Sequence, residues 1–160
     1  MKRFSPETET ELLSAGWHIG RAATDAFQRW RDELAHGGVA IFPAAEAVLT
    51  EFGGLEIGDG GAGEDAARMV VTIDASGFVD SESSKRWIRR IARACGEDVC
   101  PIGSVDEGHA LLFITESGRV VMVMDPLFWE FGAPFDAALE RLLRGQKSLG
   151  GGRLDSQSLN

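Results

Sequence analysis

The sequence predicts a single α+β domain with N-terminal helices, a largely antiparallel β-sheet with an inserted helix, and a closing C-terminal helix. The chain has 160 residues, which suits one domain with its own hydrophobic core. Helical patterns come first and strand patterns follow, so the two are segregated rather than strictly alternating. We expect the domain to occupy residues 1–145. Residues 146–160 hold three consecutive glycines and few apolar residues, which predicts a flexible tail.

Three helices are predicted in the first third of the chain. The first begins at Ser5 and Pro6, which supply a capping hydroxyl and a proline suited to a first turn, and it ends at Gly16. The second begins at Thr24 and ends at two glycines. Its apolar residues recur at helical spacing and should form its buried face: Phe27, Trp30 and Leu34. The third begins at Pro43 and also ends at a pair of glycines.

The strands are expected to follow as a meander. Residues 55–57 alternate apolar and acidic, and residues 69–73 are rich in β-branched side chains. Residues 99–103 form a short strand or loop edge, limited by Pro101. Residues 109–115 and 120–124 flank a turn and predict a β-hairpin. Pro134 opens the closing helix, which ends at Gly145.

A basic helix is predicted to begin after Ser81, between the strands. One side is apolar, and the other holds the only basic cluster of the chain: Lys85, Arg86, Arg89, Arg90 and Arg93. A basic helix can contact nucleic acid or an acidic membrane. Because this one lies in an acidic chain, we expect a solvated face whose charges pair with nearby acids.

The overall charge limits the classes of partner. The formal net charge is −9, which argues against a general nucleic-acid binder and suits either plain solubility or a basic partner. No apolar run is long enough to span a membrane, and no signal peptide is recognisable. The sequence therefore predicts a cytoplasmic protein with no nucleic acid or membrane partner, monomeric when free.

No familiar catalytic constellation is present in the sequence. Cys95, Cys100 and His109 lack the fourth ligand of a structural zinc site, and a Cys–His dyad among them stays open as an alternative. The glycine-rich loop at residues 58–65 lacks the Gly-Lys-Ser/Thr ending of a phosphate-binding loop and is acidic, so we expect a flexible loop. We therefore expect no enzymatic activity, no metal and no cofactor.

Several short segments, taken in order, resemble a known family. They are residues 12–17 followed by Arg21, residues 41–45, residues 49–55, residues 101–103, residues 116–120 and residues 137–145. Together they resemble the third group of the SUKH superfamily of bacterial immunity proteins, over roughly residues 10–145. The resemblance implies one α+β domain without catalytic residues. It also implies an antidote that binds and blocks a polymorphic toxin, often a nuclease or another nucleic-acid-modifying enzyme.

An acidic antidote can cover the basic groups with which such a toxin holds phosphate. Exposed acids with adjacent anchors are therefore the candidate contacts. The first choice surrounds the glycine-rich loop: Glu56, Asp59, Glu64, Asp65, Asp80 and Glu82. The second choice is Asp106, Glu107, Trp129 and Glu130. Two alternatives remain: a regulatory scaffold that serves as an interaction module, and a small enzyme that uses Cys95 or Cys100.

Overall fold

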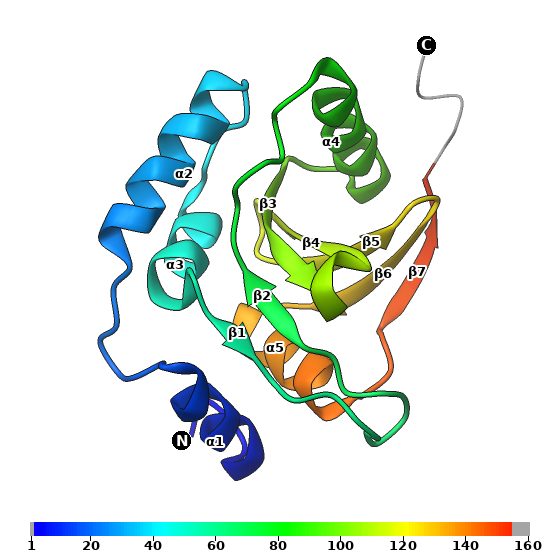
Figure 1. Cartoon of the computed structure of the whole chain (residues 1–160). Coiled ribbons are helices and arrows are strands. Elements are labelled where there is room, and N and C mark those ends of the chain that lie inside the picture. Colours follow the sequence, from blue (N-terminus) through cyan, green and yellow to red (C-terminus); the bar gives the residue numbers. More distant parts are fainter. Residues whose placement is uncertain (1, 155–160) are drawn as a thin grey trace.

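The computed structural model describes residues 2–154, and these form five helices and one seven-stranded sheet (Figure 1). Three helices come first: α1 (Pro6–Ala15), α2 (Thr24–His36) and α3 (Pro43–Phe52). Two short strands, β1 (Glu56–Ile57) and β2 (Val71–Ile73), precede α4 (Glu82–Cys95). The remaining elements are β3 (Val99–Val105), the 3-10 turn η1 (Asp106–Gly108), β4 (Ala110–Thr115), β5 (Val120–Met124), β6 (Leu127–Gly132), α5 (Phe135–Arg144) and β7 (Gly150–Arg153).

The sheet is a meander whose strand order is the chain order, β1 to β7, and each neighbouring pair is antiparallel. Helices and strands are segregated apart from α4, which is inserted between β2 and β3, and α5, which lies between β6 and β7. The predicted α+β fold is therefore confirmed. Because each strand pairs antiparallel with the next strand in the chain, no connection has to cross over another strand.

The helices begin and end where the sequence predicts. Ser5 accepts a hydrogen bond from the Thr8 backbone N–H, and Gly16 takes a left-handed conformation after α1. Pro43 and Ser81 likewise stand at the starts of α3 and α4. The predicted α2 stripe of Phe27, Trp30 and Leu34 is buried.

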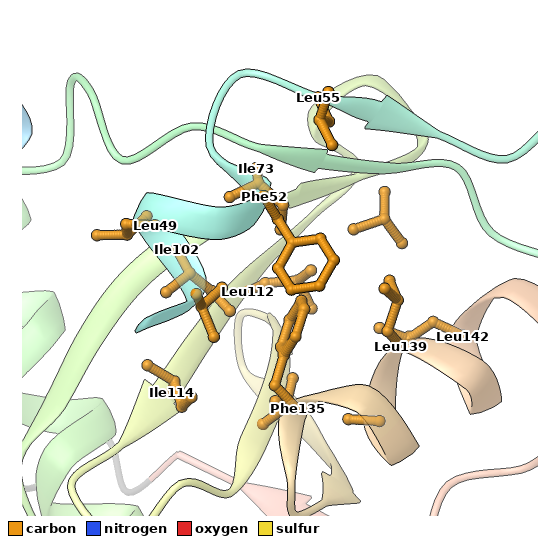
Figure 2. Packing of buried hydrophobic residues seen from close by; sticks show 14 of the residues in the cluster. Leu49, Phe52, Leu55, Ile73, Ile102, Leu112, Ile114, Phe135, Leu139 and Leu142 are labelled. Carbon is orange, nitrogen blue, oxygen red and sulfur yellow. The ribbon is translucent and has the colours of Figure 1, made fainter. Parts of the chain in front are cut away.

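The larger core lies between one face of the sheet and helices α3 and α5 (Figure 2). Phe52 at the end of α3 meets Phe135 at the start of α5, with ring centroids 5.0 Å apart. Inward residues of the strands complete this core, among them Ile102, Leu112 and Ile114. Because side chains alternate between the two faces of the sheet, one set of apolar residues on the strands faces α3 and α5.

The opposite face of the sheet is covered by α4 (Figure 1). Ile88 and Ile91 of α4 pack over Phe113, Val121 and Val123 of the central strands. Trp87 adds an edge-on contact to Phe113, with ring centroids 5.7 Å apart. Of the basic residues of α4, Arg86, Arg89 and Arg93 are exposed, whereas Lys85 and Arg90 are half-buried.

Pro101 lies inside the sheet, not at a short strand edge as its sequence context suggested. It belongs to β3, which is seven residues long and pairs with β2 and β4. The β2 pairing begins only at Gly103, so no neighbouring strand needs the missing N–H of Pro101. The register with β4 shifts between Pro101 and Gly103, a bulge that keeps Ile102 and Val105 in the same core despite their odd spacing.

The predicted flexible tail from residue 146 includes a strand at residues 150–153. These residues form β7, which pairs with β6 from Glu130↔Gly150 to Leu127↔Arg153. Added Cβ atoms at Gly151 and Gly152 would crowd the Phe128 carbonyl and ring of β6, which explains why glycine is suited to this strand. Leu154 follows and is buried in the second core. Residues 155–160 of the predicted tail lie outside the described residues.

Candidate functional site

The acidic loop between β1 and β2 is held against the end of α5. The backbone N–H of Glu64 donates to the Arg144 carbonyl at 3.0 Å, and that of Asp65 donates to the Gly145 carbonyl at 2.8 Å. Gly63 packs so closely on this helix end that an added Cβ would lie 2.7 Å from the Arg144 carbonyl oxygen. The loop expected to be flexible is therefore anchored at its tip by backbone hydrogen bonds.

Side chains of the loop are also engaged in contacts within the chain. Glu64 accepts from the Gln146 amide at 2.9 Å, and Asp65 accepts from the Lys147 backbone N–H at 3.0 Å. Asp59 pairs with Arg68 at 3.1 Å but stays 74% exposed. Glu56, on β1, is exposed, and its side chain forms no hydrogen bond or ion pair within residues 2–154.

A network of charged side chains supports the loop from α1 and α5. Arg68 reaches Glu11 of α1 at 3.4 Å, and Glu11 also pairs with Arg144 of α5. Glu140 of α5 accepts from Ser5 and Thr8 at the start of α1. Burial raises the pKa of Glu140, but these hydrogen bonds outweigh it and lower the pKa below its usual value.

Asp106 and Glu107 lie beside the same loop. The Asp106 side chain accepts from the Val70 N–H at 3.0 Å, and its own N–H donates to the Val70 carbonyl at 2.9 Å, so η1 is fixed to the end of the loop. Both residues have positive φ, 49° and 60°, which holds two exposed carboxylates in a tight turn. We name Glu56, Asp59, Glu64, Asp65, Asp106 and Glu107 the acidic edge.

The other candidate residues do not join the acidic edge. Asp80 and Glu82 lie at the start of α4, where Glu82 pairs with Lys85 at 3.1 Å and this contact lowers its pKa. Trp129 is half-buried and packs against the larger core. Glu130 pairs with Arg119, which also bonds Glu97 at 2.8 Å.

The Arg119–Glu97 cluster was missed from the sequence. Burial raises the pKa of Glu97, but hydrogen bonds from Arg119 and Ser117 dominate and lower it to about 2. Arg119 also donates to the Cys95 carbonyl at 2.8 Å and so ties the end of α4 to the β4–β5 turn. In the sequence, Arg119 is only an arginine in a predicted turn, and this does not indicate that it contacts Glu97 and Cys95 on other elements.

The thiols are poorly suited to nucleophilic chemistry. Burial raises the pKa of Cys95 to about 11 and that of Cys100 to about 12, so both stay protonated near neutral pH. His109 is exposed and its Nδ1 contacts the Asp106 carbonyl, not a thiol. Within residues 2–154, no group of three or more His, Cys, Asp or Glu side chains could hold a metal ion. No described helix is long and apolar enough to cross a membrane.

Three of the hollows on the surface of residues 2–154 stand out by their volume. The largest, about 530 Å³, lies between α3 and the start of α5, with Val48, Phe52 and Phe135 among its lining. A second hollow of about 380 Å³ lies beside α4, over the part of the sheet that α4 does not cover, next to Thr72, Ser104 and Leu111. The third, of about 490 Å³, borders the outer side of α4. None of the acidic-edge residues lines any of the three.

A family model described as SUKH-3 immunity protein matches residues 4–145, which include every element except β7. The chain belongs to the SUKH-3 immunity protein family. No curated protein and no solved structure matches it.

The segments that resembled the SUKH family are structural in this SUKH-3 member. Arg21 donates to the carbonyls of Glu51 at 2.7 Å and Gly53 at 2.8 Å, which fixes the end of α3. An added Cβ at Gly53 would lie 2.2 Å from the Leu49 carbonyl oxygen, and one at Gly103 would lie 1.9 Å from the Thr72 carbonyl oxygen. Gly53 and Gly103 therefore allow close backbone contacts that a side chain would block.

Proposed function

We propose that this SUKH-3 member is an immunity protein that binds its cognate polymorphic toxin and blocks it without catalysis. The observation that carries the proposal is the family match over nearly the whole fold. The raised thiol pKa values and the scattered histidines favour binding over an enzymatic role.

The acidic edge is the proposed contact surface, and a nuclease or another nucleic-acid-modifying enzyme is the proposed toxin. Such an enzyme exposes basic groups where it holds phosphate, and a surface of six carboxylates complements them. The backbone bonds to Arg144, Gly145 and Val70 fix this surface in place, so little conformational entropy is lost when a partner binds. We place the encounter in the cytoplasm, with the free protein as a monomer.

Co-expression with the toxin domain encoded beside this chain tests the proposal. We expect the cells to survive and the two proteins to co-purify as a complex that lacks toxin activity in vitro. Survival without a complex would contradict direct blocking. Failure to protect against any neighbouring toxin, with the protein folded, would contradict the immunity role and favour a regulatory scaffold.

A further inference from the structure

The hollow on the outer side of α4 is built mainly from hydrogen-bond donors. Its lining is Ser83, Ser84, Arg86, Trp87, Arg90 and Asp125. The two guanidinium groups, the two hydroxyls and the indole can all donate, and Asp125 is the one acidic side chain among them. With two arginines and one aspartate, the hollow is cationic in a chain whose net charge is −9.

Two donors in this hollow's lining residues lack acceptors. Trp87 Nε1 and Arg90 Nε are buried and have no hydrogen-bond partner within residues 2–154. The Arg90 side chain is only 11% exposed, so solvent does not readily replace the missing acceptor. Buried donors are nearly always paired in folded proteins, and an unpaired one favours binding of any acceptor that reaches it.

The one acid of the hollow pairs weakly with Arg90. The Arg90 Nη1 atom lies 3.5 Å from Asp125 Oδ2, and the Asp125 side chain is 46% exposed. Arg86 donates to the Ser83 hydroxyl at 3.3 Å but forms no ion pair among the described residues. Two pairs of the kind predicted for the basic face of α4 are Lys85 with Glu82 at 3.1 Å and Arg90 with Asp125 at 3.5 Å.

We propose that this hollow binds a carboxylate of a partner protein, in an acidic segment that lies across α4. A planar carboxylate matches the fork of a guanidinium group, and Arg86 and Arg90 are one helical turn apart on the same side of α4. We expect such a carboxylate to replace Asp125 as the partner of Arg90. Small movements of the side chains would then let Arg90 Nε and Trp87 Nε1 donate to its oxygens. This goes beyond the proposed toxin contact, which uses carboxylates of this chain on another surface.

The neighbouring hollow suits the chain that would carry the carboxylate. It shares Ser84 and Trp87 with the first hollow and extends along the sheet beside α4, where Phe78 and Leu111 lie in its lining together with the acid Asp74. The two hollows therefore adjoin at Ser84 and Trp87, one lined by two arginines and the other partly apolar. A nucleic-acid backbone is disfavoured, because its repeated phosphates would meet Asp125 and Asp74 as well as the two arginines, whereas a protein segment can bring a single carboxylate to the arginines.

The indole signal of Trp87 in a nitrogen-15 NMR spectrum reports directly on this site. We would titrate the full-length protein with sodium acetate, with inorganic phosphate and with a single-stranded DNA oligonucleotide. Trp87→Phe identifies the signal. Acetate should shift it saturably, more strongly than the other three indole signals, and the oligonucleotide should leave it unchanged.

Matched variants separate this site from general attraction to a basic helix. Arg86→Gln should weaken acetate binding about tenfold, and Arg90→Gln by at least as much where it folds. Arg89→Gln removes the same charge from α4 but lies outside the hollow, so binding should persist. Equal weakening by R86Q and R89Q, no saturable shift with acetate, or a shift produced by phosphate or the oligonucleotide alone would each overturn the proposal.

Discussion

Trp17 Nε1 donates to the Glu51 carboxylate at 2.9 Å, and this bond joins the turn after α1 to the last turn of α3. Glu51 also pairs with Arg3 at 2.9 Å, which in turn pairs with Asp136 of α5 at 2.7 Å. The Trp17 ring is buried and packs edge-on against Phe4. One carboxylate thus connects the N-terminal segment, α3 and α5.

Replacing Trp17 by phenylalanine should remove this bond while keeping most of the apolar packing. We expect the free energy of unfolding to fall by about 1–2 kcal/mol, because the bond to a charged acceptor is lost and the ring is smaller. Urea denaturation measures the change. Trp129→Phe is the matched control, since no described residue accepts from its indole, and its loss should be smaller.

Gly103→Ala should be among the most destabilising single changes in the sheet. The new Cβ would lie 1.9 Å from the Thr72 carbonyl oxygen, so β2 and β3 must separate. We expect a loss of more than about 2 kcal/mol in thermal or urea unfolding. Ser104→Ala, on the next residue of β3, should be nearly neutral; equal effects would show that the close approach is not limiting.

The Glu97–Arg119 pair should make stability depend on acidic pH. The pKa of Glu97 is lowered from 4.5 to about 2, so its contribution is fully present above pH 4.5 and is lost as the pH falls toward 2. The stability difference between wild type and Glu97→Gln should therefore shrink across that window. Glu116→Gln, at an exposed neighbouring position, serves as the control and should give no matching trend.

Charge reversal on the acidic edge should slow association with the toxin. Glu56→Lys with Glu107→Lys is the cleanest pair, because Glu64 and Asp65 also hold the loop through Gln146 and Lys147. We expect the association rate at low salt to fall about tenfold, with the difference narrowing at high salt. Asp25→Lys with Asp32→Lys on α2 makes the same charge change. Equal slowing by this control would remove the acidic edge from the interface.

The two cysteines should be slow to react in the folded protein. Their raised pKa values, about 11 and 12, leave little thiolate at neutral pH. We expect slow labelling by a thiol reagent in buffer and rapid labelling in urea. The variant with both cysteines changed to serine should still protect cells from the toxin; loss of protection by a folded variant would revive the enzymatic alternative.

Local sequence signals predicted the helices and the β4–β5 hairpin because caps, glycines and alternation act within a few residues. The position of Pro101 inside the sheet was harder to predict. Proline is acceptable there only because β2 does not pair with β3 at that residue. Strand β7 was missed because three glycines carry no side-chain pattern, and Phe128 on β6 provides the reason for two of them, Gly151 and Gly152.

Proximity of the candidate acids likewise depends on the fold. The sequence names Asp65 and Asp106 as exposed acids, but it does not reveal that backbone bonds fix them to Gly145 and Val70. The sequence proposed Trp129 as an aromatic anchor beside exposed acids, and in the structure its half-buried side chain packs on the larger core. Residue type therefore indicates a candidate, and distant contacts decide which candidates share a surface.

The order of strands in the sheet also bears on how this family can diversify. Because every strand pairs with the next one in the chain, a loop between two strands can lengthen or change composition without rethreading any other strand. The loop after β1 and the turn at η1 can vary in this way while α3, α5 and their phenylalanine contact stay unchanged. Such a scaffold allows partner specificity to evolve faster than the core, as successive toxin variants would demand.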